Sequence, residues 1–269
     1  MKRLYGNTGG LKADQVRRLG KLYRRRIPPD RVITFDLARE LNRLSQEIHR
    51  QIGLLINRAG KINTVIVGDH QKIVIPDLSE HRVAPGRLRG LRCLHTHLND
   101  EPLTKDDLTD LAILRLDLMG VITSGADKRP PKIHLSHILP NGSRRRPYEL
   151  LPPIDAQELD LDCLSLIKAL EDELAHVRAL HRAKIGRERA LLVSVTTAPT
   201  KVARDAMAEL RELAVSSGIE VVATLFQKRK QADPRFLTGR GKLEELTLTA
   251  LAKGASLIIF DQELNPSQI

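Results

Sequence analysis

The sequence predicts an α/β protein with two domains, a mixed α+β domain followed by a small parallel-sheet α/β domain, joined by a long helix. Strand and helix patterns alternate from residue 190 to residue 269, which is typical of a parallel sheet with crossover helices. In the first half, strand patterns come close together, as in hairpins. In chain order we expect a basic helical segment (1–35), the first domain (36–140), a linker with the connecting helix (141–189) and the second domain (190–269).

Apolar spacing and stop signals place the elements of the first half. Apolar residues at helical spacing predict a short basic helix that ends before Pro28, and a second helix from Asp36 to about Arg50. Thr104 is a suitable N-cap for a third helix. The expected ranges are helices over 11–25, 36–50 and 106–114, strands over 52–56, 64–68, 72–76, 91–97 and 132–139, and an apolar stretch over 116–122.

The second half is organised around a linker, a long helix and a βαβαβ pattern. Pro and Gly residues mark residues 141–153 as a linker, and an apolar stripe predicts a long helix over 155–184. Gly218 suits the position after a helix. The expected ranges are strands over 190–195, 220–226 and 256–260, with helices over 202–216 and 243–252 between them.

Composition bounds the class of protein. A chain of 269 residues with 41% hydrophobic content can bury a core in each of about two domains. The sequence has no apolar run that approaches the ~18 residues of a membrane span and no apolar signal segment at its start. We therefore expect a cytoplasmic protein with no membrane partner. Cys93 and Cys163 cannot build a disulfide framework, which agrees with a reducing compartment.

The positive charge is concentrated in the first half. Residues 1–150 carry 28 Lys and Arg against 16 Asp and Glu, whereas residues 151–269 carry 16 against 17. Arginine guanidinium groups suit phosphates, so this half predicts either an RNA-facing surface or a solvated basic face. Only 3% of the residues are aromatic, so an RNA contact would use backbone and shape rather than stacking. The clusters are 17–26, 87–92 and 144–146.

The most enzyme-like group of residues is His95, His97 and Asp107. Alternate residues of a strand share a face, so the two imidazoles point the same way, and Asp107 can come from the first turn of the next helix. Two imidazoles and one carboxylate leave a fourth position open, as in a catalytic zinc shell. The pattern of residues 95–107, HTHLNDEPLTKDD, resembles the HxH…SxxD signature of the JAMM metalloproteases, and particularly their RadC-like branch. This resemblance implies a zinc ion on these three residues.

Departures from that pattern leave the chemistry open. Thr104 stands where the family has Ser, Leu98 where it has Pro, and the spacing is one residue short. The family's general-base Glu is expected near residue 52, where Arg50 and Gln51 stand. Without that carboxylate the activation of water is impaired. The alternatives are a zinc-dependent hydrolase, a degenerate metal-binding interaction module, and histidines that only pack in the core, as we expect of Cys93.

The carboxyl-terminal stretch combines a Gly-Lys turn, a helix and a buried strand. Residues 239–245 read GRGKLEE, and residues 260–268 read FDQELNPSQ. Together they resemble the amino-terminal domain of the HflX family of ribosome-associated GTPases, over about 190–269. The resemblance implies a protein that binds the large (50S) ribosomal subunit and its rRNA, and that uses GTP and Mg in a GTPase domain following this region. We expect the present chain to lack that motor.

The Gly-Lys turn is not a P-loop. A P-loop requires GxxxxGK followed by Ser or Thr, a motif that the sequence lacks, so we expect no GTP hydrolysis and assign no catalytic residue. Glycines and basic side chains can still hold an anion at a helix N-terminus, and an rRNA phosphate is the anion that the resemblance implies. The alternative is a plain helix-start turn. The candidate anion-binding residues are Lys228, Arg229, Lys230, Arg235, Gly239, Arg240, Gly241 and Lys242.

Overall fold

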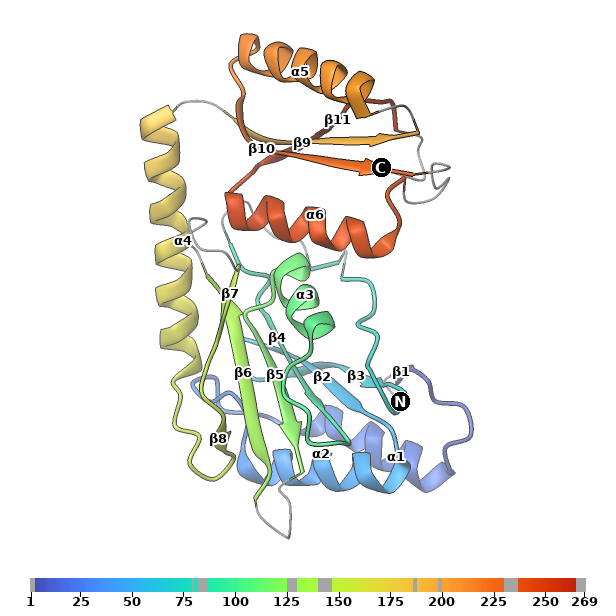
Figure 1. Cartoon of the computed structure of the whole chain (residues 1–269). Coiled ribbons are helices and arrows are strands. Elements are labelled where there is room, and N and C mark those ends of the chain that lie inside the picture. Colours follow the sequence, from blue (N-terminus) through green and yellow to red (C-terminus); the bar gives the residue numbers. More distant parts are fainter. Residues whose placement is uncertain are drawn as a thin grey trace. The chain divides into compact units, whose positions relative to one another are not determined.

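A computed structural model describes residues 3–78, 80–81, 87–124, 130–139, 147–185, 188–197, 200–229 and 237–264. The chain divides into two compact units (Figure 1). Unit 1 comprises Met1–Ile138 and Tyr148–Ala175, and unit 2 comprises Leu139–Pro147 and His176–Ile269. The molecule is a mixed α/β protein whose sheets both contain parallel strand pairs.

Unit 1 is built on one mixed sheet of eight strands. The strand order is β1-β3-β2-β4-β5-β6-β7, and β8 also pairs with β6. The pairs β1–β3 and β4–β5 are parallel and the others are antiparallel. The strands are β1 (Tyr5–Gly6), β2 (Ile52–Asn57), β3 (Ile62–Val67), β4 (Leu91–Thr96), β5 (Leu118–Thr123), β6 (Lys132–Ile138), β7 (Tyr148–Leu150) and β8 (Ile154–Asp155).

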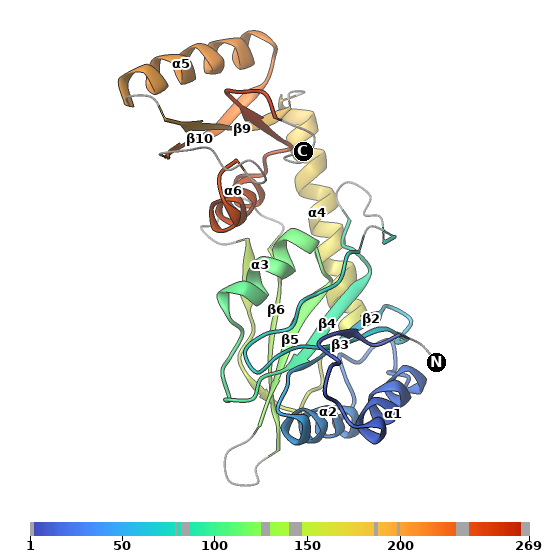
Figure 2. The same cartoon turned by 90° about the vertical axis from the view of Figure 1, so that its right-hand side faces the viewer.

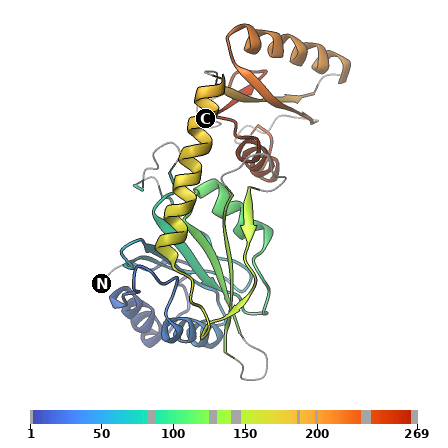
Figure 3. The same cartoon turned by 90° about the vertical axis from the view of Figure 1, so that its left-hand side faces the viewer.

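Helices cover this sheet and complete its core. They are α1 (Ala13–Lys21), the 3₁₀ turn η1 (Leu22–Arg24), α2 (Phe35–Ile48), α3 (Lys105–Leu114) and the first part of α4 (Cys163–Ile185). Figure 2 shows α1 and α2 side by side, and Arg18 of α1 forms an ion pair of 2.7 Å with Glu47 of α2. Leucines 19, 22, 37, 41 and 44 of α1, η1 and α2 are fully buried in the core. Figure 3 shows α4 as one long helix, and its residues Cys163, Ile167 and Leu170 join the same core.

The sequence located most of these elements, but three of its expectations are wrong. Residues 72–76 form no strand, because the free edge of β3 is taken by β1. The stretch expected as a linker contributes β7 to the sheet, and β8 directly follows that stretch. The long helix begins at Cys163 rather than near residue 155, since Asp155 lies in β8 and Asp162 accepts hydrogen bonds from the backbone and hydroxyl of Ser165.

Unit 2 is a three-stranded parallel sheet with one helix on each face. Its elements are β9 (Arg189–Thr196), α5 (Thr200–Ser216), β10 (Glu220–Lys228), α6 (Arg240–Lys253) and β11 (Leu257–Phe260), and the strand order is β10-β9-β11. Figure 1 shows α5 and α6 on opposite sides of the strands. Gly218 has a φ of +79°, and the next amide, that of Ile219, donates to Ala214, so the expected glycine stop of α5 is confirmed.

Candidate metal centre and anion-binding turn

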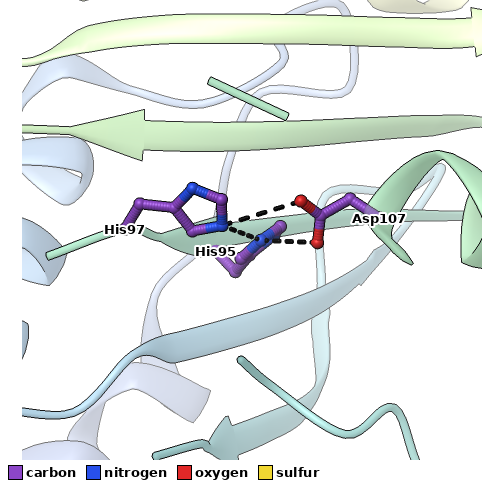
Figure 4. Close-up of side chains that lie close together, drawn as sticks. All are labelled: His95, His97 and Asp107. Carbon is purple, nitrogen blue, oxygen red and sulfur yellow. Dashed lines mark hydrogen bonds and ion pairs between the residues drawn. The ribbon is translucent and has the colours of Figure 1, made fainter. Parts of the chain in front are cut away.

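Strand β4 and helix α3 bring His95, His97 and Asp107 together. His95 lies in β4 and His97 directly follows its last residue, and Asp107 occupies the first turn of α3, so that the three side chains converge (Figure 4). All three are buried, with exposed fractions of 0%, 2% and 9%. Thr96, between the histidines, points to the other face, where its hydroxyl donates to Ser45 of α2 at 2.6 Å. Opposite faces of one strand therefore carry the polar cluster and the anchor to α2.

The ligand atoms of the three residues face one another. The Nε2 atoms of His95 and His97 lie 3.0 Å apart, His95 Nε2 lies 3.1 Å from Asp107 Oδ1, and His97 Nε2 lies 3.6 Å from Asp107 Oδ2. Bonds of about 2.0–2.1 Å to a tetrahedral zinc place neighbouring ligand atoms about 3.3 Å apart. The three separations lie around that value, with each histidine facing a different oxygen of Asp107, so the converging atoms have the kind and spacing that metal sites use.

Outer contacts hold the cluster in this arrangement. His97 Nδ1 lies 2.9 Å from the carbonyl oxygen of Glu101, so the proton belongs on Nδ1 and the lone pair on Nε2 faces the centre. Asp107 Oδ2 accepts from the amide and the hydroxyl of Thr104, both at 2.7 Å. Thr104 is also the N-cap of α3, as the sequence predicted. The Glu101 contact uses a main-chain carbonyl and left no signal in the sequence.

The charge states of His97 and Asp107 suit metal ligands. Burial lowers the pKa of His97, and the adjacent His95 lowers it further, so the neutral imidazole is favoured. Burial alone would raise the pKa of Asp107, but hydrogen bonds from His95 and Thr104 outweigh it and hold the pKa at about 2. A neutral imidazole and an ionised carboxylate are the forms that bind metals.

The residues that the resemblance to metalloproteases singled out beside the cluster are engaged in contacts of their own. Arg50 donates to the carbonyl oxygens of Asn7 and Gly9, and Glu47 pairs with Arg18. Gln51 is buried and donates to the carbonyl oxygen of Gln71. Burial raises the pKa of the Cys93 thiol well above its usual range, and Cys93 packs in the hydrophobic core as expected.

The Gly-Lys turn of unit 2 is held by the end of β10. Arg229 Nη1 donates to the carbonyl oxygen of Leu237 at 3.2 Å, and Gln227 Nε2 donates to that of Thr238 at 3.0 Å. Gly239 has a φ of +81°, and a Cβ built on it would lie 3.4 Å from Arg229 Nη1. The Arg229 guanidinium thus lies against the backbone at the start of α6, and the first turn of α6 carries no acidic residue.

The other candidate anion-binding residues are only partly gathered there. Lys228 is exposed at the end of β10, and Gly241 lies exposed in the first turn of α6. Lys242 forms an ion pair of 2.7 Å with Glu245, which offsets part of its charge. Arg240 begins α6. Lys230, Arg235 and the side chain of Arg240 lie outside the described part of the chain.

The basic clusters of the first half are more engaged than their sequence suggests. Arg92 is 1% exposed and donates to the carbonyl oxygens of Val32 and Arg31, so its expected place on an RNA-facing surface is wrong. Arg87 pairs with Glu171. Arg17, Arg18 and Arg25 of the first cluster pair with Asp14, Glu47 and Glu40. Residues 144–146 lie outside the described ranges.

Comparison with known proteins places the carboxyl-terminal region. Residues 204–269 match the family described as "GTP-binding GTPase N-terminal". These residues are an HflX-type N-terminal region. The GTPase HflX of Caldanaerobacter subterraneus subsp. tengcongensis is 40% identical over 83 residues, which are 31% of this chain and 19% of that protein. The GTPase HflX of Flavobacterium psychrophilum is 35% identical over 91 residues, which are 33% of this chain and 22% of that protein. The GTPase HflX of Escherichia coli K12 is 33% identical over 81 residues, which are 30% of this chain and 19% of that protein.

The HflX-type region includes the Gly-Lys turn and most of unit 2. Its matched residues run from Arg204 in α5 through β10 and α6 to β11. Strand β9 precedes the matched residues, yet it pairs with both β10 and β11 at the centre of the sheet. The chain spans about a fifth of the length of these HflX relatives. Among the described residues, no helix has the length and apolar content required to cross a bilayer.

Proposed function

We propose that this chain is the N-terminal part of a HflX-like GTP-binding protein and contributes an rRNA contact to the large ribosomal subunit. Relatives that share its carboxyl-terminal region are named GTPase HflX. On this proposal GTP and Mg are used by the GTPase domain of the full-length protein, which is also a partner of this region. The chain itself should not hydrolyse GTP, because its sequence has no P-loop.

The observation that carries the RNA contact is the position of Arg229 at the start of α6. A helix N-terminus has partial positive charge and free amides, so it attracts anions and disfavours cations. Here the Arg229 guanidinium lies against Gly239, and Lys242, whose charge Glu245 offsets in part, stands in the first turn. A bound phosphate would offset this accumulation of like charge. Arg235 and Arg240 extend the same basic loop in the sequence.

Sedimentation with purified large ribosomal subunits across a salt series tests this contact. We expect saturable binding that weakens as salt rises, and a smaller salt slope when Arg229, Arg235 and Arg240 are all replaced by Ala. The matched control replaces Arg17, Arg24 and Arg39 of unit 1, which are exposed, and should bind as the parent chain does. If the control variant lost binding and the loop variant kept it, the contact would instead lie in unit 1.

We propose as a second function that His95, His97 and Asp107 bind a divalent metal, zinc by the chemistry of its donors. Two nitrogens and one oxygen, all buried and converging, are typical of a zinc site with one position open. A RadC/JAMM-like fold for residues 36–140 belongs to the same proposal. A zinc ion held there would supply Lewis-acid chemistry. With Glu47 engaged by Arg18 and no carboxylate at Arg50 or Gln51, we favour a metal-binding module over a hydrolase.

Metal content decides this second proposal. We expect about one zinc per chain by elemental analysis, and the absorption bands of tetrahedral cobalt after exchange. His97→Asn and Asp107→Asn should each lose the metal. His134→Asn, a histidine of β6 outside the cluster, is the control and should keep it. If the chain held no stoichiometric metal, either as purified or after reconstitution with zinc, the three residues would only pack and hydrogen-bond in the interior.

A further inference from the structure

The two histidines of the cluster differ in their outer contacts. His97 Nδ1 lies 2.9 Å from the carbonyl oxygen of Glu101, whereas the Nδ1 atom of His95 is buried and has no hydrogen-bond partner in the described part of the chain. A histidine that binds a metal through one ring nitrogen almost always donates the other N–H to an acceptor. For His95 that acceptor is the missing part of the site.

Gln51 has a buried oxygen that lacks a donor. The residue is 2% exposed, and its Nε2 donates to the carbonyl oxygen of Gln71 at 2.9 Å. Because a carbonyl can only accept, this contact fixes which end of the side-chain amide is nitrogen. The Oε1 atom at the other end has no hydrogen-bond partner within the ranges that the structure describes. Buried polar groups are nearly always hydrogen-bonded, so this oxygen is an acceptor reserved for a donor.

Strand register places Gln51 beside His95. Gly53 of β2 pairs with His95 of β4, so both positions face the same side of the sheet. Gln51 directly precedes β2, and its carbonyl oxygen still accepts from the Gly68 amide, so the ladder continues through it. Alternation then turns Gln51 to the side of Gly53. Gln51 and His95 are diagonal neighbours, and such pairs lie about 7–8 Å apart, within the reach of long side chains.

The segment that follows β3 covers the same side and closes it to water. A Cβ added to Gly53 would lie 2.9 Å from Ile73 Cδ1. Gln71, two residues before Ile73, accepts from Gln51. Both contacts put this segment over the side that carries His95. His95 is 0% and Ile73 is 8% exposed, so bulk solvent does not satisfy the two unpaired atoms.

A metal on Nε2 makes His95 a donor at Nδ1. As a hydrogen-bonding group, His95 faces Asp107 Oδ1 through Nε2 at 3.1 Å, which favours the proton on Nε2. As a metal ligand it uses the Nε2 lone pair, and the neutral ring then carries its proton on Nδ1. The ring holds one N–H proton in either form, so the change is a shift of tautomer. Only the second form needs an acceptor beside Nδ1, and Gln51 Oε1 is an unpaired acceptor on that side.

Building on the proposed metal site, we propose that Gln51 positions His95 for the metal, its Oε1 atom accepting the Nδ1–H of His95 when Nε2 binds zinc. Gln51 is thus a positioning residue that does not touch the metal. Glu101 performs the same task for His97 through its main-chain carbonyl. Such an acceptor orients the ring and raises the basicity of the ligand nitrogen, which strengthens the bond to the metal.

The zinc affinity of Gln51 variants, measured by competition with a chelator, tests the proposal. Gln51→Met removes the acceptor and should weaken zinc binding by about 10–100-fold. Gln51→Glu keeps an oxygen beside His95 and should bind zinc at least as tightly as the parent chain. The matched control is Gln227→Met, because Gln227 also donates to a main-chain carbonyl and has a buried Oε1 without a partner. This control should keep the parent's zinc affinity.

NMR of the histidine ring nitrogens separates positioning from packing. In the zinc-loaded parent chain we expect a protected Nδ1–H on His95, and in Gln51→Met the same proton should exchange faster with water. A lower Tm shared by Gln51→Met and Gln51→Glu would reflect only the lost bond to Gln71, and the role of Gln51 would stand if their zinc affinities still differed.

The outcomes separate this role from the metal site itself. Zinc bound equally by Gln51→Met and the parent chain, an equal loss of affinity in Gln51→Met and Gln51→Glu, or an unchanged exchange rate of the His95 proton would overturn the role of Gln51 and leave the metal site in place. A parent chain that takes up no zinc would overturn both.

Discussion

Arg58 Nη2 lies 2.8 Å from Glu171 Oε1, which joins the end of β2 to helix α4 across 113 residues of sequence. The same guanidinium donates to both carboxylate oxygens of Asp117, at 2.8 Å and 3.0 Å. Glu171 also accepts from Arg87 and from the Leu88 amide. Both carboxylates are almost fully buried, with side-chain exposures of 1% and 8%. Their charges are therefore compensated from several elements at once.

Glu171→Ala should destabilise unit 1 substantially. The change leaves Arg58 with one carboxylate and removes the acceptor of the Leu88 amide, so we expect a loss of about 2–3 kcal/mol, reduced from a fully buried pair because a third of Arg58 is exposed. Hydrogen exchange of the β2 and β5 amides measures it. As a control, Asp14→Ala breaks the exposed pair with Arg17 and should change stability by no more than about 0.5 kcal/mol.

Glu171 should also make unit 1 sensitive to acid. Burial alone would raise the pKa of Glu171, but hydrogen bonds from Arg58 and the Leu88 amide outweigh it and hold the pKa below 4.5. The folded pKa is thus lower than the unfolded one. The resulting stability is fully present above about pH 4.5 and is lost as the pH falls through the lowered folded pKa. A pH series of unfolding should be flatter below pH 4.5 for Glu171→Gln than for the parent, and equal slopes would exclude this linkage.

Thr104→Ala should weaken both α3 and the proposed metal site. The hydroxyl of Thr104 donates to Asp107 Oδ2 and accepts from the Asp107 amide as N-cap. We expect a loss of about 1 kcal/mol in stability and an about 10–100-fold weaker zinc affinity, measured by competition with a chelator. Thr104→Ser keeps the hydroxyl and serves as the control. Equal zinc affinity in the two variants would show that Thr104 does not position Asp107.

Gly60→Ala should disrupt the β2–β3 hairpin. Gly60 has a φ of +73°, and an added Cβ would lie 1.7 Å from the carbonyl oxygen of Ile27. Both the left-handed backbone and the close approach oppose a side chain, so we expect at least about 2 kcal/mol of destabilisation. Gly90 is the control for the backbone effect alone, because its φ is +77° and a Cβ added to it would meet its nearest non-adjacent neighbour only at 4.0 Å. Gly90→Ala should cost about 1 kcal/mol in the same thermal unfolding measurement.

Local patterns determined much of what the sequence revealed. The alternation of apolar residues and the N-cap signal of Thr104 depend on neighbours in the chain, so β2, β3, β4 and α3 were found close to their true bounds. The spacing of His95 and His97 fixed their common face for the same reason. The parallel sheet of unit 2 followed from its alternating strands and helices, and its strand pairing confirms it.

Tertiary structure decided what depends on distant parts of the chain. Residues 72–76 have the composition of a strand, but β1 occupies the edge that they would need. Arg92 is basic in the sequence yet buried, because its guanidinium donates hydrogen bonds to the carbonyl oxygens of Arg31 and Val32. Gln51 and His95 become neighbours only through the pairing of β2 with β4. The sequence alone determined the local elements and residue types, whereas strand partners, burial and unsatisfied polar groups arose from contacts that no local pattern encodes.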